Sequence, residues 1–196
     1  MKNSPEWGYL TKMLKFLFNL LGWKLKGEVP YDLPKALIIV CPHASWVDFP
    51  IGLMARAKIG RNIHFWGKKE LFKPPFGFLF RSLGGFPVDR SKNNNLVDAI
   101  VDIFNSHDQF YGALAPEGTR KNVETLKTGF YYIADKAKVP LIFVGFDYPN
   151  KQIILNKPFY TSGDFEKDKI VIAEFFNSIA GVKKDWIKNY LNSTIS

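Results

Sequence analysis

The sequence predicts a single α/β domain: a mixed, mainly parallel sheet of about six or seven strands with helices on both faces, preceded by an N-terminal amphipathic helix. Three observations support this fold class. Apolar runs rich in β-branched residues are typical of strands buried on both faces. Segments of helical periodicity follow several of these runs. The 196 residues, 46% of them apolar, are enough for one well-buried domain and few for two.

The N-terminal residues 9–23 have helical periodicity and a polar stripe that is narrow. Their uncharged run, residues 16–21, is far shorter than the ~20 residues of a membrane span. One interpretation places this helix in a membrane interface, with Trp23, Lys24 and Lys26 at the lipid headgroups. A helix packed on its own domain explains the apolar face equally well.

The first predicted strand, residues 36–41, brings His43 to a strand end, where open α/β sheets place their ligands. Asp48 follows five residues later. A continuous helix would hold the two side chains about 140° apart, so they meet only if the chain turns after His43 and a helix begins near Asp48. A carboxylate there accepts one imidazole N–H and leaves the other nitrogen as a base.

The next elements are a helix at residues 48–59 and a short strand at residues 63–66. The Pro- and Phe-rich stretch 73–80 is unlike a core helix. Its Phe76 and Phe78 either line a groove for a hydrocarbon chain or belong to a packed irregular segment.

A glycine-bearing loop is expected at residues 84–91, because glycine lets the backbone approach a ligand closely. The loop carries Arg90 and leads into a capped amphipathic helix at residues 96–104. A second central strand, residues 110–115, then delivers residues 117–120 to the same sheet edge as the first strand.

The remaining segments complete the domain. Residues 127–138 are expected to be helical, residues 139–148 and 152–156 to be strands, and residues 164–179 and 183–191 to be amphipathic helices. Because no repeat or linker divides the sequence, we expect one domain.

The charge of the chain predicts an anionic partner. Lys and Arg outnumber Asp and Glu by 27 to 18, which gives a formal net charge of +9 and a pI near 9.5. Nucleic acid and an acidic membrane surface both fit this charge. The single cysteine excludes an internal disulfide and a Cys-based structural zinc site, and it fits a reducing compartment.

The expected sheet edge combines a His-Asp pair with Glu117 and two arginines, Arg90 and Arg120. Arginine matches phosphate oxygens with a planar fork, so a phosphate can be held next to a base. A substrate hydroxyl beside His43 can lose its proton to the imidazole while it attacks an acyl carbonyl. A thioester donor suits this scheme, because a thiolate leaves readily and the enzyme needs no nucleophile.

Four ordered segments resemble the motifs of the glycerolipid acyltransferases, especially the bacterial 1-acylglycerol-3-phosphate acyltransferases. They are His43-x4-Asp48, Gly85-Phe86-Pro87-Val88-Asp89-Arg90, Glu117-Gly118-Thr119-Arg120 and Val139-Pro140-Leu141-Ile142. The resemblance runs from about residue 36 to residue 148, and the ordered combination is far more specific than any one motif.

This resemblance implies transfer of a fatty acyl group from acyl-carrier protein or coenzyme A to a lysophospholipid hydroxyl, with neither a metal nor a further cofactor. The most direct acceptor is 1-acylglycerol-3-phosphate, which gives phosphatidic acid; another lysolipid or hydroxyl acceptor is the alternative. His43 would be the general base and Asp48 its orienting partner. The substrate-binding residues would be Lys68, Arg90, Glu117, Gly118, Thr119 and Arg120. The acyl chain would lie against Phe76, Phe78 and Pro140.

We expect residues 1–26 to form an N-terminal amphipathic, membrane-associating segment and residues 27–196 to form the acyltransferase domain. We expect peripheral or monotopic attachment to the cytoplasmic face of an anionic cell membrane.

Other classes of protein fit less well. A serine hydrolase would need a G-x-S-x-G elbow, and a catalytic zinc site would need three protein ligands; the sequence has neither pattern. The lysines are spread over several elements without an aromatic-basic signature, so nucleic acid is not an expected partner. A non-catalytic basic lipid-binding protein remains the alternative, against which the intact His43 and Asp48 argue.

Overall fold

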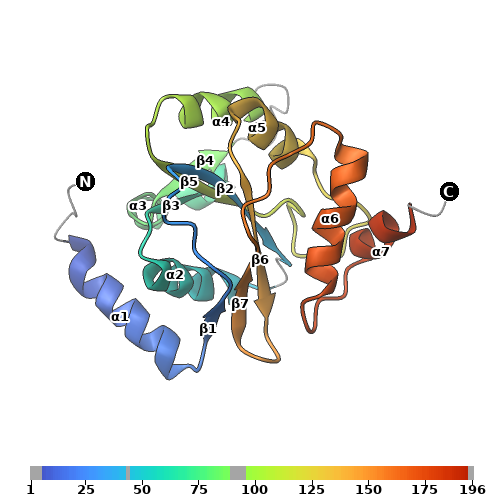
Figure 1. Ribbon diagram of the computed structural model, residues 1–196. Coiled ribbons are helices and arrows are strands. Elements are labelled where there is room, and N and C mark those ends of the chain that lie inside the picture. Colours follow the sequence, from blue (N-terminus) through green and yellow to red (C-terminus); the bar gives the residue numbers. More distant parts are fainter. Residues whose placement is uncertain (1–5, 43–44, 89–95, 194–196) are drawn as a thin grey trace.

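The computed structural model describes residues 6–42, 45–88 and 96–193. Within these residues the chain forms a seven-stranded sheet in the order β1-β7-β6-β2-β5-β3-β4 (Figure 1). The strands are β1 (Lys24–Lys26), β2 (Lys35–Cys41), β3 (Ile63–Lys68), β4 (Gly85–Val88), β5 (Phe110–Leu114), β6 (Leu141–Asp147) and β7 (Gln152–Leu155).

The sheet is mixed and mainly parallel, as the sequence predicts. β2 lies between β5 and β6 and is parallel to both, and β3 and β4 continue in the same direction. β7 is antiparallel to β6, and β1 pairs in parallel with β7. The two strands at one edge therefore run opposite to the other five.

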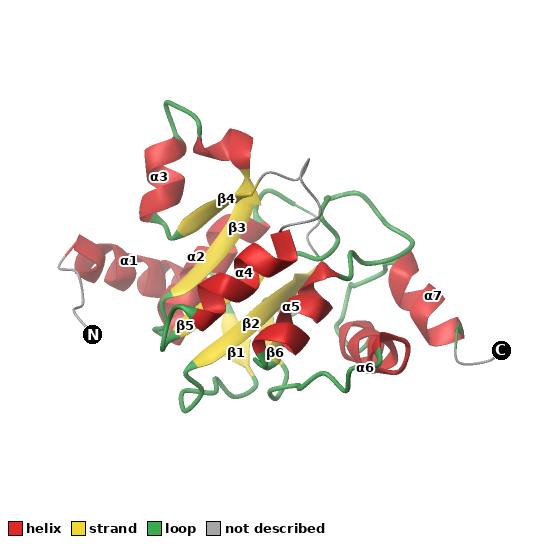
Figure 2. Ribbon diagram, turned by 90° about the horizontal axis from the view of Figure 1, so that it is seen from above, coloured by secondary structure: helices red, strands yellow, loops and turns green. Residues whose placement is uncertain are grey.

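Helices cover both faces of the sheet. Figure 2 shows α4 and α5 in front of the sheet and α1 and α2 behind it. The helices are α1 (Glu6–Leu20), α2 (Asp48–Ile59), the 3-10 helix η1 (Lys69–Phe72), α3 (Gly77–Ser82), α4 (Leu96–Asn105), α5 (Gly129–Ala137), α6 (Phe165–Asn177) and α7 (Asp185–Asn192).

The central strand β2 separates two hydrophobic cores. Leu37 and Ile39 pack into a core that is completed by residues of α4 to α7. Ala36 and Ile38 point to the other face, into a core shared with α1 and α2. Because successive strand residues alternate between faces, the unbroken apolar run of β2 is what two covered faces require.

Two strands differ from the sequence-based expectation. Residues 85–88 were expected in a loop but form β4, an edge strand that pairs with β3. An edge strand tolerates Pro87, which lacks a backbone N–H. Residues 24–26, placed by the sequence in the N-terminal segment, form β1 and pair with β7.

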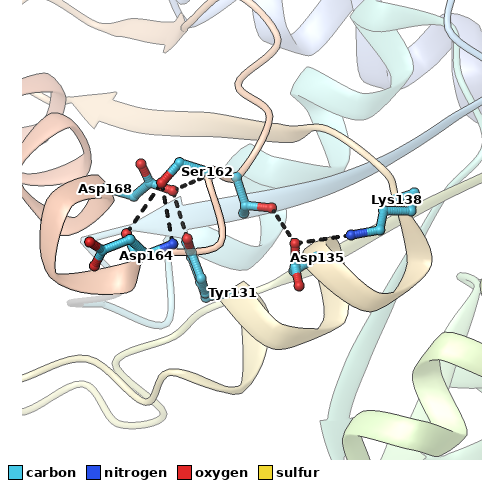
Figure 3. Close-up of polar contacts among 7 residues, drawn as sticks. Tyr131, Asp135, Lys138, Ser162, Asp164 and Asp168 are labelled. Carbon is cyan, nitrogen blue, oxygen red and sulfur yellow. Dashed lines mark hydrogen bonds and ion pairs between the residues drawn. The ribbon is translucent and has the colours of Figure 1, made fainter.

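A polar network fixes α5 and α6 to each other (Figure 3). A side-chain oxygen of Asp168 accepts hydrogen bonds from the Tyr131 hydroxyl at 2.7 Å and the Ser162 backbone N–H at 2.6 Å. Burial raises the pKa of Tyr131 to about 12, and the bond to Asp168 adds to the rise. Asp164 caps α6 by accepting from the backbone N–H groups of its first turn.

The helix α1 is packed on one side and exposed on the other. Phe18 is buried in the core shared with α2, where Leu14 and Leu17 pack against it. The exposed large apolar side chains are Tyr9, Met13, Phe16 and Leu20. Their spacing of four, three and four residues places them on one face. In the described residues no helix is long and apolar enough to cross a membrane.

The interpretation that placed Trp23 at the lipid headgroups is wrong. Its side chain is buried, and its ring lies 6.5 Å from that of Phe146 and 5.5 Å from that of Tyr148. Lys24 and Lys26 are exposed, because alternate residues of β1 point away from the core. The tryptophan therefore joins the N-terminal segment to the sheet.

Candidate active site

The carboxyl ends of the parallel strands lie side by side and form one edge of the sheet, which is distinct from the lateral edges formed by β1 and β4. The register pairs Ile39 with Leu114 and Cys41 with Gly145, and Lys68 with Val88. The strands β2, β3, β4, β5 and β6 consequently end on the same side of the sheet. Two predicted site residues of this edge, His43 and Arg90, lie outside the described residues.

Asp48 is the first residue of α2, so a helix begins where the His-Asp spacing requires one. Its side chain is buried. One carboxyl oxygen accepts a hydrogen bond from the Ser45 backbone N–H at 2.8 Å, and the other accepts from the Tyr148 hydroxyl. The carboxyl group is thus held from the loop after β2 and from the end of β6.

Tyr148 is a site residue that the sequence reasoning missed. It directly follows β6, and its ring stacks on that of Phe146 at 6.0 Å and meets that of Trp23 edge-on. Burial raises the pKa of Tyr148, and the hydrogen bond to Asp48 raises it further. The phenol therefore stays protonated at neutral pH and remains a hydrogen-bond donor.

Glu117 follows β5, and its side chain is fully buried. One carboxyl oxygen of Glu117 has both partners: it lies 3.2 Å from the Lys184 Nζ and accepts a hydrogen bond of 3.2 Å from the Trp186 indole N–H. Both partners come from the beginning of α7, near the C-terminal end of the chain. The ion pair fastens the loop after β5 to that helix.

The loop that contains Gly118, Thr119 and Arg120 borders an open hollow of about 610 Å³, lined by residues 117–119 and 123–127. Gly118 has a φ of +65°, and an added Cβ would lie 3.0 Å from the Lys127 side chain. Both the backbone angle and the close lysine favour glycine here. The Arg120 side chain is exposed. The hollow therefore has cations near it and a tight backbone turn in its wall.

The structure places Lys68 at the end of β3, exposed and at the same sheet edge as Asp48 and Glu117. It does not place all the predicted acyl-chain residues there. Pro140 precedes β6, where its carbonyl accepts a hydrogen bond of 3.0 Å from the backbone N–H of Leu37.

Pro140 therefore lies at the opposite end of the strands from Asp48, and its place in an acyl-chain pocket stays a prediction. Leu37 and Cys41 are separated by about 13 Å of strand, and only Cys41 is near the edge that carries Asp48. Phe76 and Phe78 are 65% and 74% exposed, so neither lines an enclosed pocket among the described residues.

The other titratable groups nearby have structural surroundings. The His64 ring stacks on that of Phe110 with centroids 5.0 Å apart, and burial lowers its pKa. The His107 Nδ1 lies 2.8 Å from the Ile103 carbonyl at the end of α4. Burial raises the pKa of Cys41, and Glu117 raises it further while Lys184 opposes the rise. These three residues belong to the scaffold.

Comparison with known proteins defines the class of protein to which this fold and site belong. A family model described as Acyltransferase matches residues 26–147, more than half of the chain. The chain therefore belongs to the acyltransferase family. The matched range includes both His43-x4-Asp48 and Glu117-Gly118-Thr119-Arg120.

Individual relatives carry more specific names. The chain is 30% identical over 145 residues to 1-acyl-sn-glycerol-3-phosphate acyltransferase of Streptococcus pneumoniae, covering 69% of this chain and 53% of the relative. It is 27% identical over 165 residues to the Haemophilus influenzae protein of the same name, covering 80% of this chain and 67% of that protein. It is 26% identical over 170 residues to human 1-acyl-sn-glycerol-3-phosphate acyltransferase beta, covering 83% and 59%. The chain thus spans only about half to two thirds of these relatives.

A solved structure shares the fold. The 1-acyl-sn-glycerophosphate (LPA) acyltransferase PlsC of Thermotoga maritima superposes with a TM-score of 0.58 at 18% sequence identity. The superposition covers 93% of this chain and 86% of that chain. The single α/β domain predicted from the sequence is therefore an acyltransferase-type fold.

Proposed function

We propose that this protein is an O-acyltransferase that moves a fatty acyl group from an acyl thioester to the free hydroxyl of a lysophospholipid. The observation that carries the proposal is the family match over residues 26–147, together with the sheet edge that unites Asp48 with the Glu117 to Arg120 loop. The names of the relatives favour 1-acylglycerol-3-phosphate as acceptor and phosphatidic acid as product.

In the proposed reaction, His43 removes the proton of the acceptor hydroxyl as the oxygen attacks the thioester carbonyl carbon. The new C–O bond forms, and the C–S bond of the tetrahedral intermediate breaks. The thiolate leaves and takes the proton from the His43 imidazolium, which restores the base. The donor is acyl-carrier protein or coenzyme A, and all atoms balance without a metal.

Asp48 orients the base in this scheme. A carboxylate that accepts an imidazole N–H fixes the tautomer and stabilises the imidazolium that forms. The bonds from Ser45 and Tyr148 support this role, because they hold the carboxyl group in one position. A carboxyl group held in this way loses little conformational freedom when the substrate binds.

The acceptor phosphate is proposed to bind beside the base. Arg90 and Arg120 provide guanidinium groups, and Lys68 provides an ammonium group from the end of β3. Gly118 and Thr119 bring backbone close to the phosphate. The buried Glu117 acts by holding this loop against α7, which its bonds to Lys184 and Trp186 support.

Membrane attachment through α1 is part of the proposal. The exposed stripe of Tyr9, Met13, Phe16 and Leu20 presents apolar side chains, and Lys12 and Lys15 are exposed beside it. This combination favours an anionic bilayer surface. We place the protein at the cytoplasmic face, because its single cysteine fits a reducing compartment.

The test is an acyl-transfer assay with purified protein, 1-acylglycerol-3-phosphate and either acyl-coenzyme A or acyl-carrier protein. Phosphatidic acid measured by mass spectrometry should accumulate with time for at least one donor. His43→Ala should abolish it, whereas His64→Ala tests a histidine with structural surroundings and should retain catalysis per folded molecule. Product formation by neither donor, or an undiminished rate in His43→Ala, would contradict the proposal.

A further inference from the structure

The segment from η1 to α3 exposes an unusual number of large apolar side chains. Within residues 69–81 they are Leu71, Phe76, Phe78 and Leu79. Single exposed apolar residues are ordinary, but a cluster marks an interaction surface. We call the exposed side chains of residues 69–81 the η1–α3 surface.

This exposure belongs to a well-folded segment. Phe72 is buried, and its ring lies 6.0 Å from that of Phe80. An added Cβ on Gly77 would lie 2.0 Å from the Phe72 carbonyl oxygen, so the two stretches of backbone touch. Buried Phe72 and Gly77 anchor the segment, whereas Phe76 and Phe78 remain exposed.

A basic hollow of about 310 Å³ adjoins the apolar cluster. Its lining is Lys69, Phe72, Lys73, Arg81 and Pro87. The Arg81 guanidinium donates a hydrogen bond of 2.9 Å to the Phe72 carbonyl and lies 5.6 Å from the Phe72 ring centroid. Three cationic side chains around one hollow fit an anion such as a phosphate.

The η1–α3 surface lies next to the candidate active site. η1 begins directly after Lys68, the last residue of β3, and Lys68 pairs with Val88 at the end of β4. Figures 1 and 2 both show α3 on the same side of the molecule as α1. This placement on one side is what simultaneous contact of α1 and α3 with a single flat partner requires.

We propose that the η1–α3 surface is a second membrane-binding site, which takes an anionic phospholipid bilayer. Phe76 and Phe78 enter the interfacial region, and a lipid headgroup phosphate occupies the hollow formed around Lys73 and Arg81. The combination of exposed phenylalanines with a cationic hollow is the chemistry of a bilayer interface. With α1 as the first contact, this second contact fixes the orientation of the active-site edge toward the lipid.

The test measures binding of the full chain to vesicles by co-sedimentation, and it involves no acyl transfer. Phe76→Ser/Phe78→Ser should weaken binding to phosphatidylcholine–phosphatidylglycerol vesicles about tenfold. The variant loses the apolar area that the two phenyl groups would bury in the bilayer, and even partial burial of that area accounts for this factor. Tyr132→Ser/Tyr160→Ser is the matched control, because these rings are 50% and 59% exposed elsewhere on the molecule. The control should bind like wild type.

A second variant tests the hollow. Lys73→Glu should weaken binding to the anionic vesicles several-fold and leave binding to pure phosphatidylcholine unchanged, whereas Lys167→Glu on the exposed part of α6 should affect neither. Thermal unfolding should be unchanged in all variants, because the side chains are exposed.

The proposal is overturned if Phe76→Ser/Phe78→Ser binds vesicles like wild type, or if the control variant loses binding equally. It is also overturned if these variants lose binding to an acidic acyl-carrier protein but keep vesicle binding, since the surface then serves a protein partner. The proposal rests on the membrane attachment in the proposed function, but because the assay needs no acyl transfer, its result does not depend on the proposed catalysis.

Discussion

Two buried carboxyl groups, Asp48 and Glu117, lie at the same edge of the sheet but have different partners. Asp48 accepts hydrogen bonds from two neutral groups, the Ser45 backbone N–H and the Tyr148 hydroxyl. Glu117 is held by the ammonium group of Lys184 and by the Trp186 indole. Both residues belong to motifs that the sequence analysis assigned to the active site.

The difference in partners corresponds to the different roles proposed for the two residues, orientation of the base for Asp48 and attachment of a loop for Glu117. The Ser45 and Tyr148 donors to Asp48 are both neutral, and in the proposed mechanism the carboxylate acts on the His43 imidazolium. The Glu117 carboxylate forms a buried ion pair with Lys184. In the proposed function, Glu117 therefore serves the active site by fixing the loop that follows β5.

The largest effect is expected for Asp48→Asn. The amide keeps the shape but cannot stabilise an imidazolium, so kcat should fall roughly a hundred- to ten-thousandfold. The unfolding free energy should fall by only about 1–3 kcal/mol, for altered hydrogen bonds. Steady-state kinetics and urea denaturation measure the two effects. An unchanged kcat would remove Asp48 from the proposed mechanism.

The next largest effect is expected for Lys184→Met, and it should appear in stability. Removing one partner of a buried ion pair leaves an uncompensated charge and costs about 3–5 kcal/mol. The matched control is Lys136→Met, which breaks the exposed pair with Asp98 and should cost about 0–1 kcal/mol. Urea denaturation compares the two variants.

The double variant Lys184→Met/Glu117→Gln should recover part of this loss, since no buried charge is left uncompensated. Equal stabilities for Lys184→Met and Lys136→Met would show that the Glu117 pair contributes no more than a surface pair.

A smaller effect is expected for Tyr148→Phe, which removes one donor to Asp48. We expect kcat to fall about tenfold with KM unchanged, the size of one positioning hydrogen bond. In the Asp48→Asn background the same change should have no further effect on kcat, because the two residues act as a unit.

Tyr131→Phe is the control for that prediction. It also removes a buried tyrosine hydroxyl that donates to a carboxyl group, but its partner Asp168 lies between α5 and α6. It should lower stability and leave kcat per folded molecule unchanged. Additive kcat effects of Tyr148→Phe and Asp48→Asn would argue for a purely structural Tyr148.

The smallest effect concerns pH and Cys41, which lies near Glu117. Its thiol pKa is raised above 9.0 in the folded protein by burial first and by Glu117 second. Above that pH the unfolded chain loses this proton while the folded chain keeps it, so stability falls as pH rises. The slope from this one group is at most about 1.4 kcal/mol per pH unit. Denaturation between pH 8 and pH 10 should show a shallower slope for Cys41→Ala; equal slopes would contradict the raised pKa.

The fold could be predicted where the pattern of apolar residues is strong. The apolar run of β2 and the helical periodicity of α4 specify their elements. β1 has only three residues, two of them lysines, so pairing with β7 rather than its own sequence makes it a strand. β4 carries a proline, which favours a loop until its edge position is known.

Only the residues of the sequence motifs could be predicted for the candidate site. The motifs place Asp48 and Glu117 at one edge, because strand ends of a parallel sheet coincide. They do not show that Pro140 is remote from Asp48, since it lies before its strand and not after it. The partners Tyr148 and Lys184 are separated from Asp48 and Glu117 by many residues, and no local pattern marks such contacts.

The position of Trp23 has a practical consequence for dissecting α1. A shortened protein that begins at residue 27 would lack β1 as well as α1. The hydrogen-bonding edge of β7 would then be exposed, and an exposed strand edge promotes self-association. It would also strip the indole from beside Tyr148. Loss of turnover in such a shortened protein would not distinguish a missing lipid contact from a loosened Asp48 carboxyl group, whereas Phe16→Ser alters only the outer side of α1.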